Sequence, residues 1–182
     1  MRRRCRAPIG SAGGAMKTRL PVPLPTRPGQ ESVWAYPRPP RIERVPRRAR
    51  IVLGGEEIVA TDDVVRVLET SHPPVYYLPI AAFADGSLVP THGGSFCEYK
   101  GSATYFDVHG GGAIRPRAAW TYPSPSPGYE LLTGRVAVYA QGMDACMIDD
   151  TEVQPQPGEY YGGWITPDVV GPFKGVPGSA GW

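Results

Sequence analysis

A short polar stretch beside a proline pair holds the side chains best suited to chemistry. In the sequence ETSHPPVYY, Glu69 and His72 supply an acid and a possible base, and Pro73 and Pro74 stiffen the chain behind them. Polar groups held in fixed positions next to aromatic surface are typical of ligand sites. A catalytic acid–base role is open to His72, as is a structural role in which Glu69 caps a turn and His72 bonds backbone. We favour ligand contact.

A second candidate is Lys100, which stands just before Gly101 in the sequence EYKG. If this segment is a strand, alternation places Glu98 and Lys100 on one face and Cys97 on the other. The Lys100 ammonium is then able to bind a carboxylate or phosphate, or to form a Schiff base if it is desolvated. The alternative is a solvated ion pair between Lys100 and Glu98.

Aromatic side chains that could wall a ligand pocket are numerous for a chain of 182 residues. Such side chains line pockets because they combine flat apolar faces with polar tips, although they more commonly fill cores. We expect only some of them to face a pocket. The predicted ligand-binding set is Glu69, His72, Tyr76, Lys100, Tyr105, Trp120 and Tyr122, with no catalytic residue assigned.

The cysteines and histidines give no sign of a metal or cofactor. Cys5, Cys97 and Cys146 are widely spaced and form no C-x-x-C pair, and His92 and His109 stand in glycine-rich loops. No metal and no cofactor are therefore predicted. Unpaired cysteines, the absence of a long apolar run and the absence of a secretory leader predict a cytoplasmic protein with no membrane association.

Charge is distributed unevenly along the chain. Residues 1–50 contain 13 of the 19 Lys and Arg but only two of the 17 acidic residues, although the net charge of the whole chain is +2. A basic arm of this kind is able to bind nucleic acid through phosphate contacts, but an acidic body weighs against it. Nucleic-acid binding stays an alternative to a solvated tail.

Composition divides the chain into four segments. The 22 prolines and 23 glycines predict many turns and few helices. We expect a disordered basic leader over residues 1–30, a proline-rich ordered arm over 31–49, a β-rich core domain over 50–153, and an aromatic C-terminal segment over 154–182 that wraps back onto the core.

Hairpin signals dominate the core segment. Three hairpins are predicted: residues 50–60 with a turn at Gly54 and Gly55, residues 95–108 around Gly101, and residues 134–149 with a turn at Gln141 and Gly142. Residues 75–80 predict a further strand. Residues 64–70 follow possible capping residues and predict the one short helix. The fold class is therefore mostly β, or β-rich α+β, with compact antiparallel sheets built from hairpins.

Six strings in order resemble a bacterial family, the domain of unknown function 427. They are ESVWAYPRPPRIE, VLETSHPPVYYLP, FCEYKGSATYFDV, AAWTYP, RVAVYA and YGGWITPDVVGPFKG, and they span roughly residues 31–182. The resemblance implies a tent-like β fold similar to that of B-type methionine sulfoxide reductases and zinc-binding exchange-factor relatives, with a pocket between sheets. The zinc-binding C-x-x-C pairs of those relatives are missing from this sequence.

The family is sometimes catalogued as a nucleotidyltransferase domain, which the residues support poorly. Such enzymes carry two acids spaced two apart after a glycine turn, so that both carboxylates share a strand face. Here Gly54 and Gly55 are followed by the adjacent Asp62 and Asp63, and no phosphate-binding glycine loop is found. The leading hypothesis is binding of a small organic molecule in an aromatic pocket; the alternatives are nucleotidyl or phosphoryl transfer and a nucleic-acid adaptor.

Overall fold

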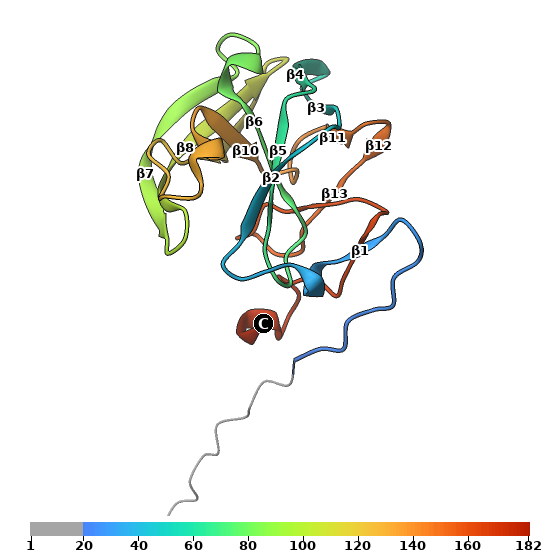
Figure 1. Cartoon of the computed structure of the whole chain (residues 1–182). Helices are drawn as coiled ribbons and strands as arrows, with labels where there is room; N and C mark the ends of the chain where they lie inside the picture. The colour runs from blue at the N-terminus through green and yellow to red at the C-terminus, as the bar shows by residue number, and fades with distance from the viewer. Residues whose placement is uncertain (1–19) are drawn as a thin grey trace, which may run out of the picture.

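Two antiparallel sheets form the body of the protein. The computed structural model describes residues 20–182, and the sheets lie face to face in it (Figure 1). The seven-stranded sheet has the order β2 (Arg41–Val45), β5 (Val64–Leu68), β6 (Val75–Pro79), β10 (Arg135–Val138), β9 (Ala113–Thr121), β8 (Gly101–Gly110) and β7 (Leu88–Cys97). The four-stranded sheet has the order β12 (Thr151–Glu152), β11 (Ala145–Ile148), β3 (Ala49–Leu53) and β4 (Glu56–Thr61).

Short strand pairs and single turns of 3₁₀ helix complete the described part of the chain. The pairs are β1 (Glu31–Ser32) with β15 (Val169–Val170), and β13 (Gln154–Pro155) with β14 (Trp164–Ile165). The 3₁₀ turns are Val33–Ala35, Ile80–Ala82, Glu130–Leu132 and Ser179–Gly181. The fold is mostly β, and residues 20–182 contain no helix long and apolar enough to cross a bilayer.

The two ends of the described chain lie against each other. The backbone N–H of Leu24 donates to the carbonyl of Gly171, and the side-chain amide of Gln30 donates to Pro167. The prediction of a disordered leader over residues 1–30 falls mainly on residues 1–19, which lie outside the described residues.

The main core lies between the two large sheets. On β3, Ala49, Ile51 and Leu53 alternate with more exposed residues, as a strand with one buried face requires. Facing them across the layer are Tyr76 and Leu78 of the seven-stranded sheet. This burial holds the sheets together.

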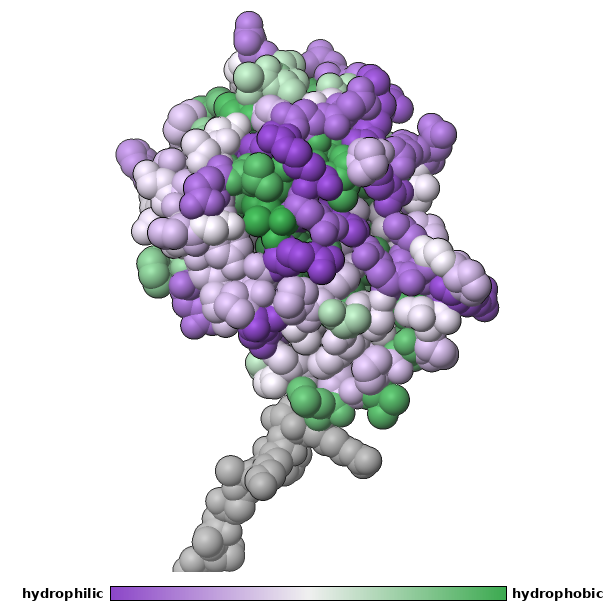
Figure 2. Space-filling model, in the orientation of Figure 1, coloured by the Kyte–Doolittle hydropathy of each residue, from purple (hydrophilic) through white to green (hydrophobic). Residues whose placement is uncertain are grey.

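A second apolar cluster covers the other face of the seven-stranded sheet. It includes Val65, Val67, Tyr77, Trp120 and Ala137. This face is covered only by loops and turns, because the four-stranded sheet lies on the opposite side. Figure 2 shows one side of the molecule, where hydrophilic residues dominate and apolar residues reach the surface in separate patches.

The predicted short helix over residues 64–70 is wrong, because this segment forms β5 between β2 and β6. Val64 faces the main core, while Val65 and Val67 face the second cluster. A strand that is apolar on both faces suits this position, and valine branching at Cβ favours it. Asp63 caps no helix, and instead accepts hydrogen bonds from Arg44 and Arg135.

The predicted third hairpin over residues 134–149 is also wrong. β10 pairs with β6 and β9 in the seven-stranded sheet, whereas β11 pairs with β3 and β12 in the four-stranded sheet. The turn at Gln141 and Gly142 therefore carries the chain from one sheet to the other. Two apolar runs around a glycine turn do not show whether the strands pair with each other.

The predicted hairpin at Gly54 and Gly55 is confirmed, with β3 and β4 antiparallel and both glycines at positive φ. Its turn touches another turn: a Cβ built on Gly54 would lie 2.2 Å from the Gly110 carbonyl oxygen. Gly110 ends β8, so this contact joins the two large sheets at one end. Only glycine suits position 54, because a Cβ would clash with Gly110 and because the backbone has a positive φ.

Replacing Gly54 should cost far more stability than replacing its neighbour. Gly55 has a similar φ, but no atom lies within 4 Å of a Cβ built there. We expect Gly55→Ala to lower the free energy of unfolding by about 1 kcal/mol and Gly54→Ala by about 3 kcal/mol. Chemical denaturation measures both values. Equal losses would contradict the contact between the turns.

Candidate functional site

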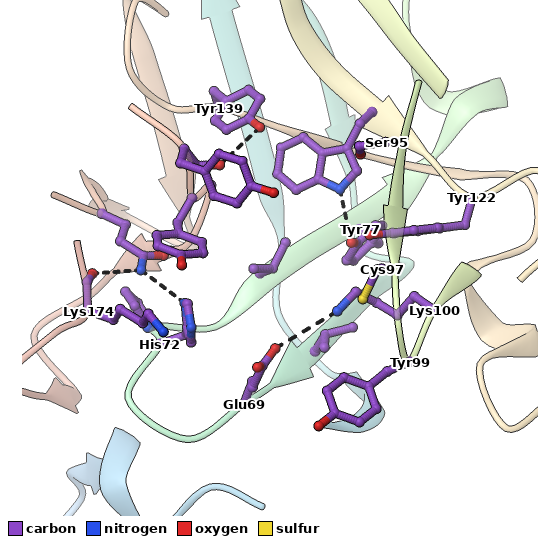
Figure 3. A pocket seen from close by; sticks show the side chains of 18 of the residues that line it. Glu69, His72, Tyr77, Ser95, Cys97, Tyr99, Lys100, Tyr122, Tyr139 and Lys174 are labelled. Atoms are coloured by element: carbon purple, nitrogen blue, oxygen red, sulfur yellow. Dashed lines mark hydrogen bonds and ion pairs between the residues drawn. The ribbon is translucent and has the colours of Figure 1, made fainter. Parts of the chain in front are cut away.

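A cleft of about 270 Å³ lies on the face of the seven-stranded sheet that the four-stranded sheet does not cover (Figure 3). It is walled by aromatic side chains and edged by charged and polar ones. The structure brings six of the seven sequence-predicted site residues to this one cleft. They are Glu69, His72, Lys100, Tyr105, Trp120 and Tyr122.

Tyr76 is the predicted site residue that lies elsewhere, and Tyr77 takes its place. Successive side chains of β6 point to opposite faces of the sheet, so only one of these two tyrosines can reach the cleft. Tyr76 faces the main core, where its ring lies 5.5 Å from that of Trp164. Tyr77 faces the cleft and is 1% exposed.

Four neighbouring strands build the aromatic wall, and β6, β9 and β8 each contribute an aromatic ring. Trp120 on β9 pairs with Tyr105 on β8 to one side and with Ala137 on β10 to the other. The indole N–H of Trp120 donates to the Tyr77 hydroxyl at 3.2 Å across the small Ala137. An alanine between two large rings leaves a hollow, and the hydrogen bond fixes the ring positions.

Rings from beyond the sheet extend this wall. Tyr139 follows β10 and lies 4.5 Å from Trp120, measured between ring centroids. Tyr161 comes from the C-terminal segment and meets the His72 imidazole edge-on at 4.6 Å. Burial raises the pKa of Tyr139 to about 12, so its hydroxyl is neutral at physiological pH.

The hydrogen bonds of Gln156 determine the protonation of His72. The Gln156 amide oxygen accepts from the Gly163 N–H at 3.0 Å, and its nitrogen donates to the Lys174 carbonyl at 2.8 Å. The same nitrogen lies 3.1 Å from Nδ1 of His72. Because a backbone N–H can only donate and a carbonyl can only accept, the amide orientation is fixed and Nδ1 must accept. The proton of the neutral ring is therefore on Nε2.

The surroundings of His72 keep it neutral. Burial lowers its pKa to about 3, and the positive charges of Lys174, Arg38 and Lys100 add to this effect. A neutral imidazole with its proton on Nε2 offers a hydrogen-bond donor there. It has no free basic nitrogen, because Nδ1 already accepts from Gln156.

Lys100 lies in the tight turn between β7 and β8 rather than in a strand. The hairpin predicted over residues 95–108 is present, with longer strands than expected. The nearest acid to Nζ of Lys100 is Glu69, at 4.0 Å, and a pairing with Glu98 does not form. Arg38 also pairs with Glu69, at 3.3 Å. Figure 3 shows Glu69 and Lys100 pointing toward each other from opposite sides of the cleft.

Lys174 adds a second ammonium at the His72 end of the cleft, as Figure 3 shows. Its Nζ donates to the backbone oxygen of Trp182 at 2.8 Å and lies 5.8 Å from the centre of the Tyr161 ring. Burial lowers the pKa of Lys174, and Arg38 lowers it further. Lysines therefore border the cleft at two places.

Within residues 20–182, one cysteine thiol lines the cleft. Cys97 lines the cleft and is half-buried, whereas Cys146 is buried in the main core. Among residues 20–182, no cluster of three or more His, Cys, Asp or Glu side chains is able to hold a metal ion. The described residues thus provide aromatic surface, two lysines and a fixed N–H donor.

Sequence reasoning missed Gln156, Lys174, Tyr139 and Tyr161. Gln156, Tyr161 and Lys174 stand in proline- and glycine-rich segments with no strand period, more than 30 positions after residues 69–122. The only available signal was the aromatic content of residues 154–182, which predicted contact with the core but no particular partner.

One family model matches residues 41–149, which is more than half of the chain, and its description is a domain of unknown function, DUF427. The matched region contains β2 to β11, including all seven strands of the sheet that carries the cleft. No curated protein matches the chain. The site must therefore be interpreted from its own chemistry.

The neutral state of His72 makes stability depend on pH in a predictable direction. Between pH 6.5 and about 3, the unfolded chain binds a proton at His72 that the folded chain does not bind. Acid therefore favours unfolding in this window, with a contribution of up to about 1.4 kcal/mol per pH unit. His72→Asn, which keeps an acceptor near the Nδ1 position, should flatten the stability profile between pH 7 and pH 5.

The exposed His92 provides the matched control. His92→Asn should keep the slope of the unsubstituted chain, when denaturation midpoints are measured at several pH values. Nitrogen-15 NMR should show the Nε2–H tautomer at His72. A His72 ring that titrates near pH 6.5 would contradict this account.

Proposed function

The chain belongs to the DUF427 family, and on that premise we propose that it binds a small planar organic molecule in the cleft beside Trp120. The family description assigns no activity, so the proposal is drawn from the site. The observation that carries it is the meeting of an aromatic wall with fixed polar groups in one hollow. Small-molecule sites combine these same two features.

The size and stiffness of the cleft both suit a small ligand. Its 270 Å³ is close to the lower end of the range for small-molecule pockets, roughly 300 Å³. Trp120 is tied to Tyr77, and His72 is tied to Gln156, so neither ring has to be ordered when a ligand enters. A preformed site loses less entropy on binding.

Nucleotidyl or phosphoryl transfer has less support. Asp62 pairs with Arg48, while Asp63 pairs with Arg44 and Arg135. The hydrogen bond from Arg135 lowers the pKa of Asp63, so the charge of this carboxylate is balanced by arginine rather than left for a metal ion. Neither aspartate lines the cleft.

The nucleic-acid alternative depends on the basic leader. Six of its seven Lys and Arg belong to residues 1–19, which lie outside the described residues. Deleting residues 1–19 would abolish a salt-sensitive gel shift if this alternative held. The cleft itself gives no support to nucleic-acid binding.

A neutral planar probe tests binding directly. We expect 2-naphthamide, added to the full chain at millimolar concentration, to shift the indole N–H signal of Trp120 in proton–nitrogen NMR spectra. Trp34 is the matched control, because its indole N–H is held by the Pro172 carbonyl outside the cleft and should not shift. Trp120→Phe should weaken binding, since the stacking area falls and the bond to Tyr77 is lost.

Two results would overturn the proposal. One is the absence of any shift at Trp120 up to the solubility limit of the probe. The other is a larger shift at Trp34 than at Trp120, which would place the binding site elsewhere. Tyr76→Phe provides a further control, because Tyr76 faces the main core and its substitution should leave binding unchanged.

A further inference from the structure

We infer that the ligand carries a carboxylate, held between the ammonium of Lys100 and the Nε2–H of His72 while its planar part lies against Trp120. This inference rests on the proposed function, because it names the chemical class that the same cleft would take. It is carried by two hydrogen-bond donors, the Lys100 ammonium and the Nε2–H of His72, that have no acceptor within residues 20–182.

The first support is the state of Lys100. Its side chain is only 11% exposed, yet within residues 20–182 its ammonium has no hydrogen-bond partner. The closest acidic oxygen, on Glu69, is 4.0 Å away, and Arg38 approaches the same carboxylate more closely at 3.3 Å. Nζ of Lys100 is not among the fully buried polar atoms, so its three N–H donors are open to a ligand oxygen that enters the cleft.

The second support is the donor at His72. Gln156 occupies Nδ1 and has no further hydrogen-bonding group to offer, because Gly163 and Lys174 use the rest of its amide. Nε2 therefore carries the proton and acts as a hydrogen-bond donor. His72 is 8% exposed and lines the cleft, so the natural acceptor for this proton is a ligand oxygen.

The charges around His72 favour an anion at this end of the cleft. Lys174, Arg38 and Lys100 are the three charged groups that lower the pKa of His72. Two carboxylates also line the cleft: Glu69 is neutralised by Arg38, and Glu98 lies in the turn beside Tyr99. Because Arg38 and Glu69 offset each other, Lys174 and Lys100 are the positive groups that remain around His72, and they disfavour a cationic ligand there.

A carboxylate fits these donors better than a phosphate does. Lysine binds both groups, but phosphate sites in proteins commonly add arginine forks or backbone N–H groups at a helix N-terminus. No arginine lines the cleft, and the helical turns of the described residues are all short 3₁₀ turns. Lys100 and His72 both line the cleft, and each is able to donate to one oxygen of a planar carboxylate.

Affinity for matched probes tests the inference. Calorimetry on the full chain at pH 7 would compare 2-naphthoate with the neutral 2-naphthamide and the cationic 2-naphthylmethylammonium. We expect 2-naphthoate to bind at least 10-fold more tightly than the amide, because charge-assisted hydrogen bonds exceed neutral ones. The cation should bind most weakly.

Two variants locate the effect. Lys100→Met keeps the apolar stem and should reduce the preference for 2-naphthoate over 2-naphthamide to about threefold or less. Arg50→Gln removes one positive charge from a surface pair with Glu57, away from the cleft, and should leave the preference intact. Circular dichroism confirms that each variant is folded.

The outcomes separate this inference from the proposed function. Equal affinity for the naphthoate and the amide, with the Trp120 signal shifted by both, would overturn the carboxylate inference and leave the binding proposal standing. A preference of 10-fold or more that survives in Lys100→Met would also overturn it. Failure of all three probes to bind would remove the proposed function together with the inference.

Discussion

The central strands of the seven-stranded sheet are apolar on both faces, but a second sheet covers only one face. This constraint follows from alternation along the strands: β6 sends Tyr76 into the main core and Tyr77 to the opposite face. Loops and turns cover the opposite face incompletely. The uncovered part is the cleft, and its aromatic wall is therefore also part of the fold, with Trp120 and Tyr77 stabilising the sheet while they shape the hollow.

The C-terminal segment completes the cleft by supplying the groups that fix its polar end. Gln156 bonds Gly163 and Lys174 within the C-terminal segment and His72 in the core, 84 positions away. Each of its hydrogen-bonding groups has a partner, and it is 3% exposed. A fully satisfied buried amide has one orientation only. Docking of this segment therefore determines both the geometry of the cleft and the proton position on His72.

The sequence predicted correctly those features that depend on residues close together in the chain. Paired glycines predicted the turn at Gly54, and the stretch 69–105 supplied residues that do line the cleft. The helix predicted at residues 64–70 was wrong, because the sequence VVRVL suits a helix as well as a strand that is buried on both sides. The choice was made by the neighbouring strands β2 and β6. Likewise, nothing near Gln156 indicates its partner His72, 84 positions away, since that contact arises only when the chain is folded.

Our central proposal is that the uncovered face of the large sheet is a binding site whose lysine-bordered end selects a carboxylate. A crystal structure of the protein soaked with 2-naphthoate tests it most directly. The account predicts ring density against Trp120, with the carboxylate oxygens at hydrogen-bond distance from Nζ of Lys100 and Nε2 of His72. Density elsewhere on the molecule, or a ring in the cleft with its carboxylate turned to solvent, would contradict it.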